Sequence, residues 1–192
     1  MGFIPQEIYI TPINQQEETT MKRKLVTIAV TIVTLTFTGI AAALTSSAMY
    51  ELKTEIEINA PAERVWNILT DADQFSQWNP FIHELKGILS PGEKLEVVLG
   101  APGQSKMTFK PEVLVFDQAK EFRWIGKLFV KGLFDGEHIF ELQQRGEKTY
   151  LIHREEFTGI LVPLFKGMLE KETKPGFELM NQALKERAEQ QA

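Results

Sequence analysis

The chain has 192 residues, of which 43% are hydrophobic and 24% are charged, so wholesale disorder is excluded. Its formal net charge is -5 and it shows no basic stripe, which argues against nucleic acid as a partner. The lack of cysteine excludes disulfides, thiolate metal sites and cysteine nucleophiles.

The first 48 residues predict a polar extension followed by a transmembrane helix. Residues 1–20 are polar with no clear period, and Met21, which stands before a basic head, is an alternative start. Residues 25–44 provide 20 consecutive uncharged residues, enough to cross a hydrocarbon core of about 30 Å. The basic residues at 22–24 should stay cytoplasmic, which predicts that the following domain is extracytoplasmic.

Two interpretations of residues 21–48 stay open. The segment is either an uncleaved membrane anchor or a signal peptide cleaved near Ala48, where the sequence Ser-Ser-Ala offers small residues. Its uncharged run exceeds the usual signal core of about 7–15 residues, which favours the anchor. The predicted location is therefore a membrane-anchored extracytoplasmic domain, or a domain secreted after cleavage.

Residues 49–192 are predicted to form one α+β domain. Charged and uncharged residues alternate over 50–58, which is the period of a half-buried strand. Two short helices follow: the first runs over 59–69, where Pro61 suits the first turn, and the second over 70–80, ended by Asn79-Pro80.

Six further strands are predicted at residues 81–89, 93–99, 106–117, 120–129, 134–144 and 148–158. Their short connections favour antiparallel pairing. Residues 161–190 are predicted to be helical, with a kink or break at Pro175-Gly176. This order predicts a curved seven-stranded antiparallel sheet around one long C-terminal helix, with a cavity between them.

Four segments carry a resemblance to a known family, namely residues 60–81, 132–142, 153–161 and 176–189. They resemble the SRPBCC superfamily, which is START-like, includes the polyketide cyclase/dehydrase and lipid-transport proteins, and has the helix-grip fold. The resemblance covers about residues 50–190 and implies a hydrophobic cavity. Its members share a cavity rather than one chemistry, so the resemblance alone does not name a reaction.

Strand pairing predicts a polar spot on the cavity wall. If the turn near residues 144–149 is tight, opposed residue numbers sum to about 293, which places His138 opposite Glu155. A sum of about 262 in the preceding hairpin places Trp124 beside His138. Apolar residues share this face, so it should meet the helix. There Glu155 would be desolvated, and a nearby imidazole could hold it charged by hydrogen bonding.

Inward strand positions and the covering helix supply the predicted ligand contacts. These are Trp78, Phe81, Trp124, His138, Phe140, His153, Glu155, Phe157, Phe165, Met168, Phe177 and Met180.

The favoured function is binding of a small hydrophobic ligand, such as a lipid or a polyketide-like molecule, and transport is compatible with it. The alternative is a polyketide cyclase/dehydratase-type enzyme with His138 and Glu155 as its acid–base pair. No nucleophile or oxyanion site is recognisable, which favours binding. A third hypothesis is a partner-binding domain related to chaperone activators, and the predicted extracytoplasmic location argues against it.

Zinc bound by His138, His153 and Glu155 lacks a second supporting motif, so neither a metal nor a cofactor is predicted. The oligomeric state stays open.

Overall fold

The computed structural model describes residues 49–190 except residue 129. The predicted extension at 1–20 and the predicted membrane segment at 21–48 lie outside the described residues. Of the helices that the structure does describe, none has the length and apolar character needed to span a membrane.

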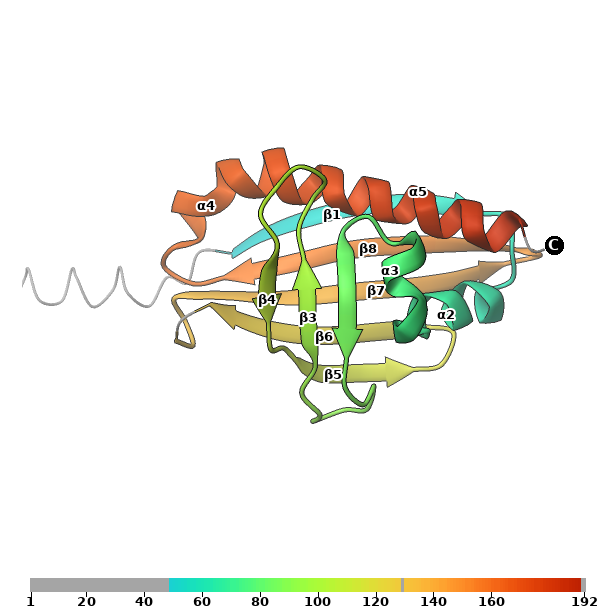
Figure 1. Cartoon of the computed structure of the whole chain (residues 1–192), viewed down its shortest axis with the longest axis horizontal. Coiled ribbons are helices and arrows are strands. Elements are labelled where there is room, and N and C mark those ends of the chain that lie inside the picture. The colour runs from blue at the N-terminus through green and yellow to red at the C-terminus, as the bar shows by residue number, and fades with distance from the viewer. Residues whose placement is uncertain (1–48, 129, 191–192) are drawn as a thin grey trace, which may run out of the picture. The chain divides into compact units, whose positions relative to one another are not determined.

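A five-stranded antiparallel sheet forms the base of the domain, in the order β1-β8-β7-β6-β5 (Figure 1). One face of it meets the core, as the alternating burial along β1 shows. Its strands are β1 (Met49–Ile58), β5 (Glu112–Asp117), β6 (Glu121–Leu128), β7 (Phe134–Arg145) and β8 (Lys148–Thr158).

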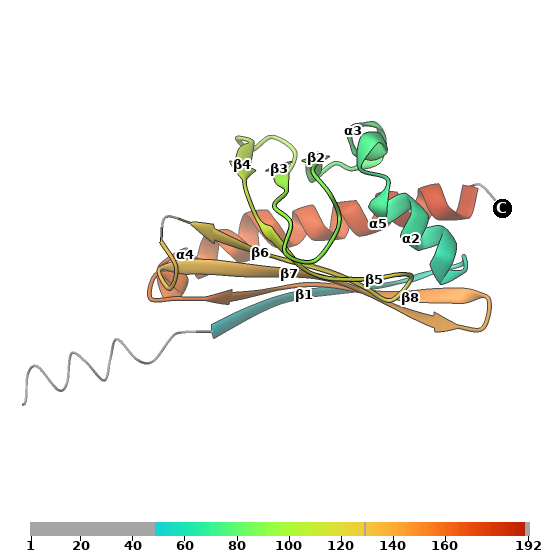
Figure 2. The ribbon, with the colours of Figure 1, turned by 90° about the horizontal axis from the view of Figure 1, so that it is seen from below.

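A second sheet of three strands, in the order β2-β3-β4, crosses above the first one (Figure 2). Its strands are β2 (Ile82–Lys86), β3 (Glu96–Leu99) and β4 (Met107–Phe109). The prediction of one seven-stranded sheet is therefore wrong in strand count and continuity. The strand predicted over 106–117 is divided at Pro111, because proline has no N–H for a sheet ladder, and its halves β4 and β5 belong to different sheets.

The predicted helices are present, and they lie on the same side of the large sheet as the small sheet (Figure 2). After β1 come α2 (Ala62–Thr70), the 3-10 turn η1 (Ala72–Gln74) and α3 (Phe75–Trp78). After β8 come α4 (Val162–Met168), the π-helical segment η2 (Leu169–Thr173) and α5 (Lys174–Gln190).

The helix does not end at Pro175-Gly176, where a kink or break was predicted; its irregular part is the π-helical segment η2, which ends at Thr173. Pro175 lies directly after η2 in a helix that continues into α5, and because it has no N–H it cannot donate to a carbonyl of the preceding turn. One side of α5 is fully buried, because Phe177, Met180 and Leu184 are each 0% exposed.

Gly176 lets the small sheet and α5 approach closely. A Cβ at this position would collide with the ring of Phe81, the residue that leads into β2. The rings of Phe81 and Phe177 then pack edge to face, with centroids 5.4 Å apart. This contact joins the small sheet to the covering helix beside the cavity.

We expect Gly176→Ala to lower the free energy of unfolding by about 1–2 kcal/mol, because overpacking against the buried Phe81 ring outweighs the higher helix propensity of alanine. Urea denaturation measures it. Gly167→Ala in α4 is the matched control, since a Cβ there meets nothing within 4 Å. Equal stability of the two variants would contradict the close approach.

Candidate functional site

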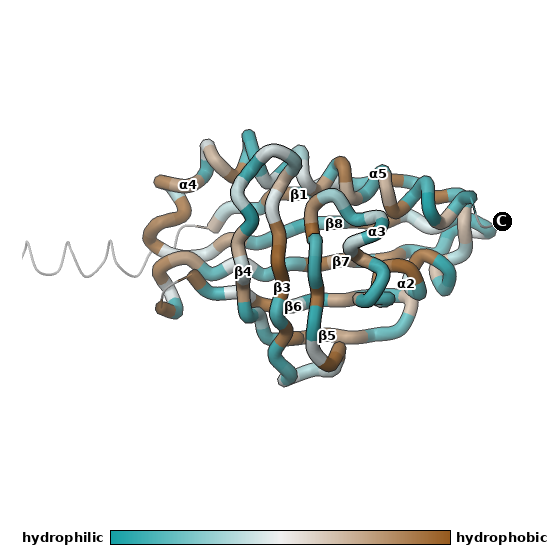
Figure 3. Tube along the Cα trace, viewed as in Figure 1, coloured by the Kyte–Doolittle hydropathy of each residue, from teal (hydrophilic) through white to brown (hydrophobic). Residues whose placement is uncertain are grey.

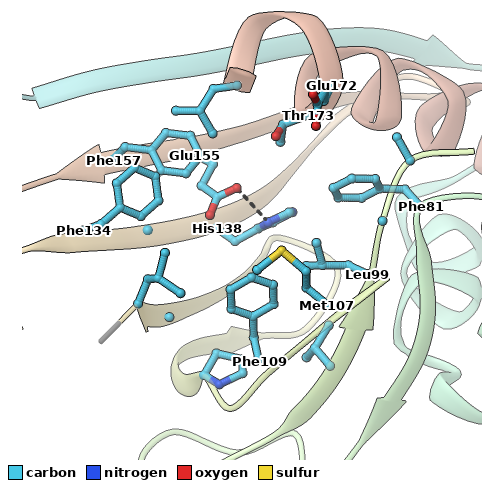
Figure 4. Close-up of a pocket in the computed structure, with 18 of the residues that line it drawn as sticks. Phe81, Leu99, Met107, Phe109, Phe134, His138, Glu155, Phe157, Glu172 and Thr173 are labelled. Carbon is cyan, nitrogen blue, oxygen red and sulfur yellow. Dashed lines mark ion pairs between the residues drawn. The ribbon is translucent and has the colours of Figure 1, made fainter. Parts of the chain in front are cut away.

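A cavity of about 180 Å³ lies where the two sheets and η2 meet (Figure 4). A cavity of about 150 Å³ can hold benzene, so this one has room for a ligand with at least one ring. Its wall is mostly apolar, with contributions from Val97, Leu99, Met107, Phe109, Phe134 and Phe157.

The mouth of the cavity is marked by lining residues that are also exposed at the surface. They come from the loop before β4 and the first residue of β4, from the end of β6 and from the α4–η2 segment, and they are Gln104, Ser105, Met107, Lys127, Met168 and Glu172. Two of them are methionines, whose flexible side chains adapt to different ligand shapes. A ligand can therefore enter between the small sheet and the π-helical segment.

The predicted strand register is confirmed. His138 lies opposite Glu155, and Trp124 lies opposite His138. All three line the cavity, so the row that was expected across three strands does face inward. The ring of Trp124 stacks on the ring of His138, with centroids 4.7 Å apart.

Glycine makes the space that Glu155 occupies. A Cβ on Gly136 would collide with the Glu155 carboxyl, and Gly126 lies directly opposite Gly136 on the neighbouring strand. Because neither glycine has a side chain, the backbone of β6 and β7 is uncovered on the side of the Glu155 carboxyl. The sequence offered the signal, because glycine inside a strand often marks a close approach, but it was not used in the prediction.

Burial keeps both members of the polar pair uncharged. The Glu155 side chain is 18% exposed and lines the cavity, and burial raises the pKa of its carboxyl to about 8. The ring of His138 is 2% exposed, and burial lowers its pKa to about 3. The expectation that the imidazole keeps Glu155 charged is therefore wrong, because at pH 7 both groups are mainly neutral. His138 Nδ1 lies 3.5 Å from Glu155 Oε2 (Figure 4).

A buried chain of hydrogen bonds runs from His138 away from the cavity. Nε2 of His138 lies 2.7 Å from Nε2 of His153, and Nδ1 of His153 lies 2.8 Å from Oδ1 of Asn181. Nδ2 of Asn181 donates to Oγ1 of Thr54 at 2.9 Å. The Thr54 hydroxyl donates to the backbone carbonyl of His153 at 3.1 Å, which closes the chain.

The final carbonyl gives this chain one direction. A carbonyl only accepts, so the Thr54 hydroxyl donates to it and accepts from the Asn181 amide. The Asn181 oxygen then accepts from Nδ1–H of His153, whose Nε2 is left without a proton. His138 therefore donates its Nε2–H to His153 and presents an unprotonated Nδ1 toward Glu155.

Burial and the neighbouring His138 lower the pKa of His153 well below its usual range, while the bond to Asn181 raises it by less. His153 thus stays neutral, as the tautomer assignment requires.

Six of the twelve predicted ligand contacts line the cavity, namely Phe81, Trp124, His138, Glu155, Phe157 and Met168. The structure does not place the other six on its wall: Trp78, Phe140, His153, Phe165, Phe177 and Met180. Among them, Phe177 stacks on His153 with centroids 3.9 Å apart. That the lining residues contact a ligand stays a prediction.

Thr54 and Asn181 are residues of the site that sequence reasoning missed. Both are buried, at 8% and 2% exposure. Asn181 follows Met180 on the apolar side of α5, and a polar residue in that position is a usable signal. Thr54 alternates with charged residues on β1, and this pattern is typical of any inward-facing strand position, so it gave no sign of a polar role.

Within the described part of the chain, no group of three or more His, Cys, Asp or Glu residues could hold a metal ion. His138, His153 and Glu155 consequently do not form a metal cluster.

The sheet, the covering helix and the cavity define a helix-grip protein of the SRPBCC class. The family described as polyketide cyclase / dehydrase and lipid transport matches residues 49–189, and the chain belongs to this family. No protein with a curated description matches the chain in sequence.

Solved structures share the fold at low sequence identity. Norcoclaurine synthase from Thalictrum flavum, in complex with dopamine and hydroxybenzaldehyde, is 13% identical, with a TM-score of 0.61 over 79% of this chain and 92% of that chain. The Zhui aromatase/cyclase from Streptomyces sp. R1128 is 16% identical, with a TM-score of 0.60 over 74% of this chain and 94% of that chain. At these identities the likeness concerns the fold alone.

The raised pKa of Glu155 predicts a specific loss of stability with rising pH. The pKa of this carboxyl is about 8 in the folded protein and 4.5 in the unfolded chain. Its contribution to the free energy of unfolding is therefore fully present below pH 4.5 and is lost as the pH rises to about 8. We expect Glu155→Gln to gain stability over the wild type across this window, by at most about 1.4 kcal/mol per pH unit.

Urea denaturation at several pH values between 5 and 9 measures this difference. Glu178→Gln, at an exposed position on α5, is the control and should run parallel to the wild type. If the free energy of unfolding of Glu155→Gln changes with pH in the same way as that of the wild type, Glu155 is not held neutral.

The direction of the hydrogen-bond chain predicts which nitrogen of His138 carries the proton. Ring ¹⁵N shifts of the folded protein should show protonated Nε2 and unprotonated Nδ1. Thr54→Val removes the hydroxyl that links the chain to this carbonyl, so we expect a mixture of His138 tautomers and a loss of about 1–3 kcal/mol of stability. Protonated Nδ1 in the wild type would refute the assigned direction.

Proposed function

We propose that this domain binds a small, uncharged hydrophobic ligand that carries one hydroxyl group, and that Glu155 and His138 hold this hydroxyl. The observation that carries the proposal is the apolar cavity of about 180 Å³, whose wall exposes a carboxyl and an imidazole that are both neutral at pH 7. Membership of a family described by cyclases and lipid transport supports a ligand of this kind.

The hydrogen-bonding capacity of the pair favours a hydroxyl over a carbonyl. Protonated Glu155 has one O–H to donate, while Nδ1 of His138 has a free lone pair. Their separation of 3.5 Å leaves a direct bond between them weak. A ligand hydroxyl can accept from Glu155 and donate to His138, whereas a carbonyl can satisfy Glu155 alone. An anionic ligand would find no positive partner in the pair.

The energetics make the polar pair important for affinity. Burying about 200 Å² of apolar ligand surface contributes about 5 kcal/mol, which is comparable to the cost of immobilising the ligand. The two hydrogen bonds to the hydroxyl therefore decide between ligands of the same shape, at about 0.5–1.5 kcal/mol each.

A second candidate is general acid catalysis of the cyclase/dehydratase type. It is favoured by the pKa of about 8 at Glu155, because this carboxyl keeps a proton at neutral pH that it could give to a leaving hydroxyl. Such a reaction must also remove a proton from the substrate, and His138, whose pKa is about 3, is a poor base for this step. Binding therefore remains the favoured function.

A matched pair of ligands tests the proposal. We expect benzyl alcohol to bind the full chain about tenfold more tightly than toluene at pH 7, as measured by chemical-shift titration of residues on the cavity wall. Above pH 8 the preference for the alcohol should fall, because ionised Glu155 no longer donates.

Glu155→Gln keeps a donor of similar shape, so its preference for the alcohol should persist above pH 8. The exposed variant Glu178→Gln should behave as the wild type at every pH. Equal affinity for the two ligands, or no shift of any residue on the cavity wall, would overturn the proposed polar recognition.

A further inference from the structure

We propose that one end of the domain docks onto an anionic lipid bilayer and that the cavity mouth opens beside this docking surface. The surface, called here the apolar end, is formed by the exposed side chains of Met49, Val130, Ile160 and Leu164. Docking of this end does not depend on which ligand the cavity binds.

The apolar end gathers residues from three distant parts of the chain. Met49 begins β1 opposite Thr158 at the end of β8. The turn between β6 and β7 is joined to the segment after β8, because the N–H of Ile160 donates to the carbonyl of Gly132 at 3.3 Å. Leu164 lies in α4, directly after that segment. Figure 1 shows α4, the start of β1 and the β6–β7 turn at the same end of the sheet.

A glycine holds the two loops of this end together. Gly159 has a φ of +128°, a conformation that side chains disfavour, and a Cβ there would collide with the backbone of Leu133. Two residues after Gly159, the N–H of Leu161 donates to the carbonyl of Leu133 at 3.0 Å. The loops that carry Val130 and Ile160 therefore form one surface.

The exposure of these side chains is high for their type. Leu164 is 76% exposed, Met49 74%, Val130 62% and Ile160 44%. Single exposed apolar residues are common, but a group of large ones at one edge marks an interaction surface. The trace through α4 is largely hydrophobic at this end of the molecule (Figure 3).

The cavity mouth adjoins the apolar end. Lys127 and Leu128, at the end of β6, line the cavity just before the turn that carries Val130. Met168 closes α4, lines the cavity and is 43% exposed. The same two segments thus provide both the mouth and the exposed apolar side chains, so docking would bring the mouth to the lipid surface.

The charge of these segments favours anionic lipid. Residues 127–135 and 160–174 contain five lysines against three acidic residues, in a chain whose net charge is -5. Asp135 is buried and accepts from the N–H of Gly132, while Glu170 accepts from Tyr50 and lies 3.9 Å from Lys174. Lysines near an anionic bilayer are attracted by its negative surface potential.

The sequence before Met49 limits how far Met49 can lie from a membrane. The uncharged run at 25–44, proposed above as an anchor, is separated from Met49 by residues 45–48 only. A linker of this length spans at most about 18 Å when fully extended. If the run lies in the bilayer, Met49 can be no farther than this distance from its surface.

Single-cysteine labelling tests this proposal on the full chain, because the native sequence has no cysteine. Val130→Cys and Leu164→Cys would carry a fluorophore, with the protein reconstituted into vesicles of phosphatidylcholine with or without phosphatidylglycerol. Ile88→Cys and Leu114→Cys are the controls, since both positions are exposed and apolar but lie outside the apolar end.

Quenching by lipids that carry a nitroxide on the acyl chain should be at least threefold stronger at positions 130 and 164 than at 88 and 114. Equal quenching at all four positions, or none at any of them, would overturn the docking surface. Protection of the labels at 130 and 164 by added unlabelled chain without lipid would also overturn it, because a second copy would then be the occupant.

Phosphatidylglycerol should increase quenching at position 164 by at least twofold at low salt, and high salt should remove the increase. The substitutions Lys131→Glu and Lys171→Glu together should abolish it, while Lys94→Glu, at an exposed position outside both segments, should leave it intact. A response to phosphatidylglycerol that survives the paired substitutions would overturn the requirement for an anionic bilayer.

Discussion

The arrangement of the site depends on one buried carbonyl, that of His153, because it is the fixed acceptor at which the hydrogen-bond chain ends. This acceptor determines the orientation of the Asn181 amide and the tautomers of both histidines. It thereby leaves Nδ1 of His138, on the side toward Glu155, without a proton. Every link is neutral, so the chain can be buried without an ion pair and its desolvation cost. Its members come from β1, β7, β8 and α5, so the same bonds that set the chemistry also hold the covering helix on the sheet.

The cavity results from how two sheets and one helix meet rather than from a single curved sheet. Pro111 lies between β4 and β5, of which the first belongs to the small sheet and the second to the large sheet. Gly176 and Gly136 then supply space at two places, one for the Phe81 ring beside α5 and one for the Glu155 carboxyl. The polar pair is thereby held in an otherwise apolar wall, where a carboxyl keeps its proton.

Local sequence patterns predicted the pairing of His138 with Glu155 because a tight turn and strict alternation fix both register and face. They could not predict the charge state of Glu155, which depends on burial by segments far apart in the chain. The role of Asn181 was missed for a related reason, since the phase of a helix over a sheet is set by packing. Phe177 and Met180 were correctly placed on the inner side of α5, yet they fill the core beside the cavity rather than its wall.

The central claim is that Glu155 is a neutral acid in a cavity with an oriented acceptor beside it. The most direct test is a pH titration of the ¹³C carboxyl resonance of Glu155 in the folded chain. A protonated carboxyl at pH 7, with a titration midpoint near a pKa of about 8, is the predicted result. A carboxylate that is already ionised at pH 6 would contradict the account, because the site would then hold a charge that favours a different class of ligand.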